Sequence, residues 1–195
     1  MKTVADRKTL LVLFGSPHQN GATARLLEEF LQAVDRETEI AVIDAYRENI
    51  RPCVACGFCK TREACSFSDM DSIDGLLRRA DFLVVASPVY NLSFPAPLKA
   101  ILDRTQRYFE ARFSLRKKPP IEKPKRAVLL ATAGSENADG AAIMEKQLRM
   151  IFSVMNTRLE SVVALTGLDG TNGGEASLRA ARQARKAALA MQDKI

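Results

Sequence analysis

Five short apolar runs, separated by segments with helical periodicity, constrain the fold of this chain more than any other feature. We expect each run to form a β-strand, at residues 9–14, 39–43, 82–86, 127–131 and 161–165. The first, third and fourth runs are almost uniformly apolar, which is typical of strands buried on both faces of a parallel sheet. The alternation therefore predicts an α/β fold built from strand–helix units.

Apolar residues recur at helical spacing in two of the intervening segments, and we expect both stripes to face the sheet. The first stripe contains Leu26, Leu27, Phe30, Leu31 and Val34, and the second contains Ile143, Met144, Leu148, Ile151, Phe152 and Met155. Pro97 suits a first helical position, where its missing N–H is not needed. An alanine-rich segment at about residues 175–191 predicts the last helix. Three prolines and several charges make residues 117–124 the expected flexible connection.

The length of 195 residues suits one well-buried domain, which we expect to span residues 1–195. Hydrophobic residues make up 47% of the chain, yet no apolar run is long enough to cross a membrane. Residues 1–8 are charged and lack the apolar core of a secretory leader. We therefore expect a cytoplasmic protein, with no membrane partner, whose cysteines meet a reducing environment.

The net charge of +6 is unevenly distributed, because nine Lys and Arg residues lie between Arg104 and Arg126, beside only Glu110 and Glu122. This concentration predicts a local basic patch rather than the extended stripe of a nucleic-acid-binding protein. We therefore expect no nucleic-acid partner. A solvated helix end and loop would explain the patch, and capture of a phosphorylated nicotinamide nucleotide is the alternative.

All four cysteines lie within thirteen residues, at Cys53, Cys56, Cys59 and Cys65. This spacing is close to ferredoxin-type runs, in which four thiolates converge on a [4Fe-4S] cluster. Structural zinc more often uses two CxxC pairs with a long spacer, and disulfides imply an oxidising compartment. A cluster, zinc, disulfides and free thiols all stay open as alternatives. The cysteines follow the second strand, so we expect them at the sheet edge where the strands end.

The loop after the first strand has the composition of an anion site at a helix N-terminus. A Walker A loop would need a lysine where Ala22 stands, and the G-x-G-x-x-G of dinucleotide-binding folds is also missing. What remains is a set of neutral donors, Ser16, Asn20, Thr23 and nearby backbone amides, with His18 beside them. Such a set suits the terminal phosphate of FMN, although turn chemistry alone can also explain it.

Two further loops follow the carboxyl ends of the third and fourth strands, where open α/β sheets bind their ligands. In the first loop, Tyr90 offers a ring for packing on an isoalloxazine, and Asn91 offers an amide for its polar edge. In the second loop, residues 132–135 are small and leave their backbone amides accessible. Each loop alone could be structural, but the three together favour a flavin site.

These blocks resemble the flavodoxin-like NAD(P)H-dependent FMN reductases and, within them, the iron-sulfur flavoproteins. The resemblance covers about residues 9–191 and rests on residues 15–17 and 20–23, the four cysteines with residues 69–71, and residues 87–91, 97–99 and 103–104. It implies a flavodoxin-like three-layer sandwich, with helices on both faces of a five-stranded parallel sheet in the order 2-1-3-4-5. It also implies non-covalent FMN and a homodimer or homotetramer.

The resemblance further implies which residues form the sites. Those expected to hold the FMN phosphate are Ser16, His18, Asn20, Gly21, Ala22 and Thr23, and those expected to hold the ring are Pro88, Val89, Tyr90, Asn91, Ala133 and Gly134. The metal ligands, if a cluster is present, would be Cys53, Cys56, Cys59 and Cys65. No side chain need be catalytic, because the cofactor performs the chemistry.

The predicted function is an FMN-dependent oxidoreductase that passes electrons from NAD(P)H or a reduced carrier to a quinone, flavin, azo or nitro compound. With a [4Fe-4S] cluster, the protein would also exchange single electrons with a ferredoxin-type carrier. The alternatives from other classes are a non-enzymatic redox sensor whose cysteine loop is a thiol switch or metal site, and a zinc-stapled interaction domain. A Ser-His-Asp hydrolase is disfavoured, because G-x-S-x-G is missing and His18 is the single histidine.

Overall fold

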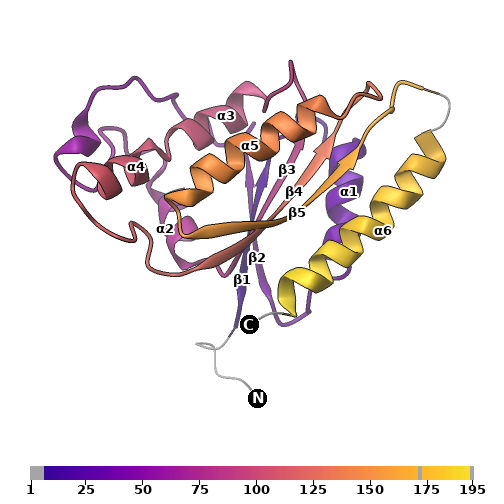
Figure 1. Ribbon diagram of the computed structural model, residues 1–195, viewed down its shortest axis with the longest axis horizontal. Helices are drawn as coiled ribbons and strands as arrows, with labels where there is room; N and C mark the ends of the chain where they lie inside the picture. Colours follow the sequence, from indigo (N-terminus) through magenta and orange to yellow (C-terminus); the bar gives the residue numbers. More distant parts are fainter. Residues whose placement is uncertain (1–6, 171–172, 194–195) are drawn as a thin grey trace.

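The computed structural model describes residues 7–170 and 173–193 (Figure 1). The expectation of no secretory leader falls mainly on residues 1–6, which lie outside the described residues. Five parallel strands form one sheet in the order β2-β1-β3-β4-β5. The strands are β1 (Thr9–Phe14), β2 (Glu39–Asp44), β3 (Phe82–Pro88), β4 (Lys125–Thr132) and β5 (Thr157–Leu165). The predicted three-layer sandwich and strand order are therefore confirmed.

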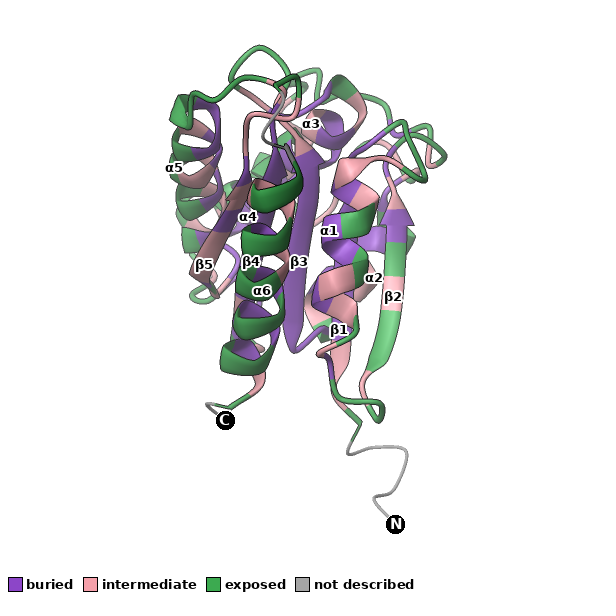
Figure 2. Cartoon of the chain, turned by 90° about the vertical axis from the view of Figure 1, so that its right-hand side faces the viewer, coloured by how far each residue is buried: buried purple, intermediate pink, exposed green. Residues whose placement is uncertain are grey.

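Helices cover both faces of the sheet (Figure 2). One face packs against α1 (Ala22–Leu31) and α6 (Gly173–Gln192), and the other against α2 (Asp71–Arg79), α3 (Ala96–Asp103) and α5 (Asp139–Ser153). The short helices α4 (Gln106–Phe113) and η2 (Phe58–Lys60) lie beyond α3, at one side of the molecule (Figure 1). None of the described helices is long and apolar enough to span a membrane.

Two apolar layers, one on each face of the sheet, hold the fold together. Alternate residues of β1 point to opposite layers, so that Leu11 and Leu13 meet α2, α3 and α5 while Leu10 and Val12 meet α1 and α6. Residues 82–86 of β3 are buried throughout, as a strand covered on both faces requires. Both predicted helical stripes pack against the sheet, with Leu31, Ile143 and Ile151 at their partly exposed margins.

Two short helices, α2 and α4, have no counterpart in the prediction. In α2 the buried residues are only Ile73 and Leu77. In α4 the usual pattern is inverted, because Arg107 and Glu110 are buried whereas Phe109 and Phe113 are 43% and 56% exposed. Hydrophobic periodicity cannot identify a helix that buries its charges.

Smaller differences concern element ends. Strand β5 begins at residue 157 rather than 161, and its pairing with β4 shifts register between Ala127 and Val128. Pro97 is the second residue of α3 rather than the first, because the helix begins at Ala96. Element boundaries depend on local hydrogen bonds that apolar patterns do not encode.

The basic stretch from Arg104 to Arg126 is not the single exposed patch that the sequence predicts. Arg104, Arg107 and Lys125 are buried. Lys117 pairs with Glu63 at 2.8 Å, and Lys123 pairs with Asp81 at 2.9 Å, so residues 117–124 are irregular but attached to the domain. Burial of three cations and pairing of two others with carboxylates therefore reduce the exposed, unpaired charge of this stretch.

Candidate functional site

Three of the predicted loops meet at the carboxyl edge of the sheet. Register places Phe14 of β1 beside Ala86 of β3, and Pro88 of β3 beside Thr132 of β4. Backbone bonds continue past the strand ends, because Gly15 N–H donates to Ala86 O at 2.8 Å and Val89 N–H donates to Thr132 O at 2.8 Å. We call the loops at residues 15–21, 89–95 and 133–138 the flavin edge, after the cofactor that the sequence predicts for them.

The loop at residues 15–21 is folded by its own hydrogen bonds. Ser16 is buried, and its Oγ accepts the His18 N–H at 3.2 Å, while Gly21 N–H donates to His18 O at 3.3 Å. Gly21 is the N-cap residue of α1, and no side chain caps that helix. The first-turn amides of α1 therefore keep the donor capacity that an anion at a helix N-terminus uses. His18 and Asn20 are exposed beside them.

Thr23 lies deeper than the rest of this loop. Its Oγ1 is 2.7 Å from Thr132 Oγ1, and both side chains are buried. The hydroxyl is thus held against the end of β4 rather than exposed to solvent. Because a hydroxyl can accept one bond and donate another, Thr23 can still donate while Thr132 orients it. The sequence includes Thr132 in the small-residue loop 132–135, but the contact of its hydroxyl with Thr23 is visible only in the structure.

The loop after β3 turns tightly. Tyr90 and Ser93 exchange two backbone hydrogen bonds of 2.9 Å, and the turn residues Asn91 and Leu92 have positive φ angles of 50° and 61°. This turn leaves the Tyr90 ring exposed. Tyr46 follows β2 and was not singled out in the sequence; burial and then the charge of Tyr90 raise the pKa of Tyr46. Tyr90 therefore presents an exposed ring at the flavin edge.

A fourth loop, after β5, closes the edge beside Gly134. Leu168 N–H donates to Ala133 O at 3.3 Å, and Asp169 N–H donates to Gly134 O at 3.0 Å. A Cβ on Gly134 would stand 2.1 Å from Asp169 Oδ2. Only glycine fits at this position while the Asp169 carboxylate keeps its place.

The four cysteines line one pocket of about 440 Å³, formed by residues 53–67 and by the junction of α3 and α4 at residues 103–110. We call it the cysteine pocket. All four thiols are free of disulfides. Among the described residues, no three His, Cys, Asp or Glu side chains are arranged around a single metal ion. The four sulfurs therefore surround a cavity rather than one point.

The cysteines differ in their surroundings. Cys53 and Cys56 are exposed, whereas Cys59 and Cys65 are half-buried. The hydrogen bond between Cys56 Sγ and Ser66 Oγ, 3.2 Å long, is the main cause that lowers the pKa of Cys56. Burial is the main cause that raises the pKa of Cys59, with added repulsion from Glu110, Cys53 and Cys65. The thiols are thus close enough to influence one another electrostatically.

The cysteine pocket is offset from the flavin edge. Its segment begins after β2, as predicted, but folds against α4 instead of joining the three loops (Figure 1). The flavin-edge loop at residues 89–95 precedes α3, and the pocket residue Arg104 follows it. Eight helical residues span about 12 Å, which separates the two ends of α3.

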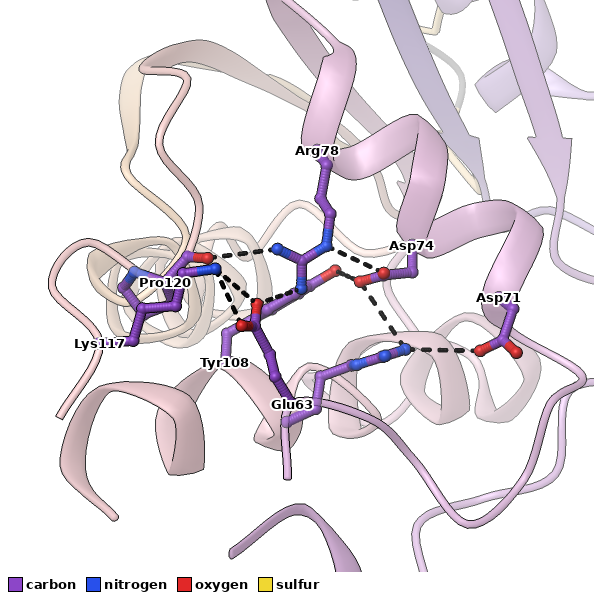
Figure 3. Close-up of polar contacts among 8 residues, drawn as sticks. Glu63, Asp71, Asp74, Arg78, Tyr108, Lys117 and Pro120 are labelled. Atoms are coloured by element: carbon purple, nitrogen blue, oxygen red, sulfur yellow. Dashed lines mark hydrogen bonds and ion pairs between the residues drawn. The ribbon is translucent and has the colours of Figure 1, made fainter. Parts of the chain in front are cut away.

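An ionic network fixes residues 53–65, which we call the cysteine segment, to the domain (Figure 3). The Glu63 carboxylate lies between Arg78 and Lys117, with a nitrogen of each at 2.8 Å. Arg78 in turn donates to Asp74 at 3.0 Å, and the Tyr108 hydroxyl donates to the same carboxylate. Burial opposes ionisation of Glu63, but bonds from Lys117 and Arg78 outweigh it and lower the pKa of Glu63. The chain between Cys59 and Cys65 is therefore attached to α2 and to Lys117 by charged side chains.

A parallel sheet in the order 2-1-3-4-5, with glycine-containing loops and an anion-type helix start at its carboxyl edge, defines a flavodoxin-like cofactor-binding protein. Residues 9–168 match the NADPH-dependent FMN reductase family. The chain belongs to that family, which makes it an NAD(P)H-dependent oxidoreductase and confirms the resemblance found in the sequence.

Individual relatives and solved structures are consistent with this family and fold. The chain is 33% identical over 144 residues to the iron-sulfur flavoprotein of Methanosarcina thermophila, covering 73% of this chain and 70% of that protein. Its fold matches the NAD(P)H:quinone oxidoreductase of Methanothermobacter marburgensis with a TM-score of 0.72 at 22% identity, covering 97% and 98% of the two chains. It also matches an FMN-dependent NADH-azoreductase of Bacillus anthracis, solved with FMN, with a TM-score of 0.67 at 12% identity and coverage of 95% and 100%.

Proposed function

We propose that this protein binds FMN non-covalently at the flavin edge and uses NAD(P)H to reduce a small acceptor such as a quinone, a flavin, an azo compound or a nitro compound. The observation that carries this proposal is the meeting of three predicted loops at one sheet edge. Membership of the FMN reductase family supports the cofactor and the reaction class.

The residues present fit FMN. The uncapped start of α1 supplies amide donors, and Gly21 leaves room there, because a Cβ on it would come 3.0 Å from the His18 Cβ. We assign phosphate binding to Ser16, His18, Asn20, Gly21, Ala22 and Thr23, and contacts with the ring to Pro88, Val89, Tyr90, Asn91, Ala133 and Gly134.

When bound, FMN supplies the chemistry that accepts electrons in pairs and releases them in pairs or singly. The residues of the chain bind the cofactor and orient it. Ser16 Oγ accepts the His18 N–H, and the Thr132 hydroxyl bonds to that of Thr23. These two hydrogen bonds shape the residues that we assign to the phosphate. Tyr90 presents an exposed ring on a rigid turn, suited to packing against a planar ligand. We assign no catalytic side chain.

We further propose that Cys53, Cys56, Cys59 and Cys65 hold a [4Fe-4S] cluster that exchanges single electrons with a ferredoxin-type carrier. Four thiols around one cavity are the donor set that such a cluster uses. The name of the Methanosarcina thermophila relative supports the same assignment. Our proposal also includes a homodimer or homotetramer in the cytoplasm.

The test is a visible spectrum of protein purified without oxygen, with FMN, iron and acid-labile sulfide measured on one sample and NAD(P)H oxidation measured with a quinone. We expect bound FMN, about four irons and four sulfides per chain, and steady turnover. Protein that neither retains added FMN nor turns over would contradict the flavin proposal. Bound FMN with no iron would contradict the cluster alone.

A redox sensor is the second candidate, because Cys53 and Cys56 are exposed and a hydrogen bond from Ser66 lowers the pKa of Cys56. Exposed thiols of lowered pKa oxidise readily. This function predicts reversible oxidation of the cysteines by peroxide in a protein that does not turn over NAD(P)H. Sustained NAD(P)H consumption would exclude it.

A further inference from the structure

Two buried arginines form part of the wall of the cysteine pocket. Arg104 and Arg107 both line the cavity and are only 2% and 5% exposed. Burial of a guanidinium costs free energy unless its charge is paired and its N–H groups form hydrogen bonds. The lining of the pocket therefore includes two cationic side chains that are shielded from solvent.

Arg104 ties the cysteine segment to the end of α3. Its Nη1 donates to Arg51 O at 2.9 Å, its Nη2 donates to Phe67 O at 3.0 Å, and Nη2 also pairs with Asp69 Oδ1 at 2.9 Å. Burial works against its charge, but Asp69 and the nearby Cys65 sulfur outweigh burial and raise the pKa of Arg104. This arginine thus connects both flanks of the cysteine segment and lines the same pocket as the four thiols.

Several N–H groups of the two arginines lack a partner. Within the described chain, Arg104 Nε and Arg107 Nε and Nη1 are buried without a hydrogen bond. The closest carboxylates to Arg107, on Asp71 and Asp74, are each 3.7 Å from Nη1, which is too far for a good hydrogen bond. Unpaired buried donors of a cation favour an anionic occupant nearby.

A buried carboxylate also lines the pocket. Glu110 is buried on α4, lines the same cavity, and accepts hydrogen bonds from Gln106 and Ser114. The lining of the pocket therefore carries buried cations, Arg104 and Arg107, and a buried anion, Glu110, beside the four cysteines.

We propose that Arg104 and Glu110 are positioning residues that set the reduction potential of a cluster on the four cysteines in opposite directions. The proposal rests on the cluster assigned above. A cluster held by four thiolates is anionic, and an added electron makes it more so. Arg104 therefore favours the reduced form and raises the potential, whereas Glu110 favours the oxidised form and lowers it.

The test is a redox titration of the cluster, followed by its visible and electron paramagnetic resonance spectra in anaerobically reconstituted protein. Four variants are compared with the wild type: Arg104→Met, Arg104→Lys, Glu110→Gln, and Arg158→Met as a control. Arg158 is an exposed arginine on β5, outside the pocket lining. Potentials are read only from samples with wild-type iron and sulfide content.

We expect Arg104→Met to disfavour reduction by about tenfold, which is 59 mV for a one-electron couple. Arg104→Lys should shift the potential less, because the charge remains while the fork of N–H donors is lost. Glu110→Gln should shift it upward, and Arg158→Met should leave it unchanged. A purely structural role would not produce shifts of opposite sign.

Arg104→Met also removes the attachment of residues 51 and 67, so it can fail to assemble a cluster. In that event Arg104→Lys and Glu110→Gln decide, and unchanged potentials in both would overturn the proposal. A wild type that holds no cluster after reconstitution would remove the cluster assignment itself, and the inference with it. A loaded wild type with unresponsive variants would remove the inference alone.

Discussion

At the flavin edge the candidate donors are hydroxyls and backbone amides at the ends of buried strands, whereas the cysteine pocket is walled by buried charges from an irregular segment and from α4. The apolar core fixes the strands of the sheet, and the strand ends in turn fix the geometry of the flavin edge. Residues 45–57, which lead into the cysteine segment, form neither helix nor strand. The segment depends on Arg104 and Glu63 for its attachment to the domain.

This difference predicts how each region responds to change. Damage to apolar packing should disturb the flavin edge together with the whole fold, because the two share the same core. Loss of a charge should disturb the cysteine pocket while the sheet and the flavin edge stay intact. The variants below test that separation.

The largest expected effect is that of Gly15→Ala. A Cβ at this position would lie 2.4 Å from Leu98 Cδ2 and 3.0 Å from Leu98 Cβ, and Leu98 is fully buried on α3. Overpacking of this kind should lower the free energy of unfolding by about 3 kcal/mol and weaken FMN binding with it. Urea unfolding and flavin fluorescence titration measure the two effects.

Gly174→Ala is the matched control, because nothing lies within 4 Å of a Cβ there and the residue is on α6. Alanine in a helix should leave stability unchanged or raise it slightly. Equal stability of Gly15→Ala and Gly174→Ala would contradict the close approach of α3 to the first loop.

The second effect is a loss of stability in acid that originates at the cysteine pocket. Burial opposes the charge of Asp69, but hydrogen bonds from Arg104 and Arg51 prevail and lower its pKa to about 2. An unfolded Asp titrates at about 3.9, so the unfolded chain binds this proton more readily. The contribution, about 2 kcal/mol for bonds to charged groups, is complete above pH 4 and disappears as the pH falls through about 2.

Unfolding by urea at several pH values between 5 and 2 measures this loss, and Asp69→Asn should flatten the profile. The reactivity of the four pocket thiols, measured relative to the unfolded chain at the same pH, should rise in acid before the sheet unfolds. An identical pH profile in the wild type and in Asp69→Asn would show that this carboxylate does not anchor the segment.

The contrast between the two regions also explains what sequence alone could predict. Apolar runs predicted the sheet, its order followed from the family resemblance, and the loops after the first, third and fourth strands followed from the strand ends. Helix α4 escaped prediction because it buries Arg107 and Glu110. The partners of Arg104 lie 53 and 37 residues away in sequence, and no local pattern reports such pairings.

At the flavin edge the residues missed were those that act through others. Thr132 was predicted only as part of the small-residue loop 132–135, and its bond to Thr23, 109 residues away, is visible only in the fold. Asp169 and Tyr46 belong to loops without a phosphate or ring motif. Sequence therefore identifies residues that carry a motif, whereas their supporting residues require the structure.

A smaller effect is expected for Glu63→Gln. The amide lacks the negative charge and the second acceptor oxygen that hold Arg78 and Lys117, so the free energy of unfolding should fall by about 1 kcal/mol, since all three groups are partly exposed. Cysteine reactivity should rise, while FMN affinity should stay at the wild-type value. Glu175→Gln, on an exposed pair with Arg179, is the control and should change neither quantity. A parallel loss of FMN affinity would show that the two regions are not independent.

The smallest effect belongs to Thr132→Val. Valine removes the hydroxyl that orients Thr23 and leaves the Thr23 hydroxyl buried without its partner. We expect FMN affinity to fall by about 0.5–1 kcal/mol, whereas Thr132→Ser should retain wild-type affinity because it keeps the hydroxyl. Fluorescence titration with FMN and with riboflavin separates the cause, since riboflavin has no phosphate. If Thr132→Val weakens both ligands equally, the threonine pair supports the loop in general and does not orient a phosphate donor.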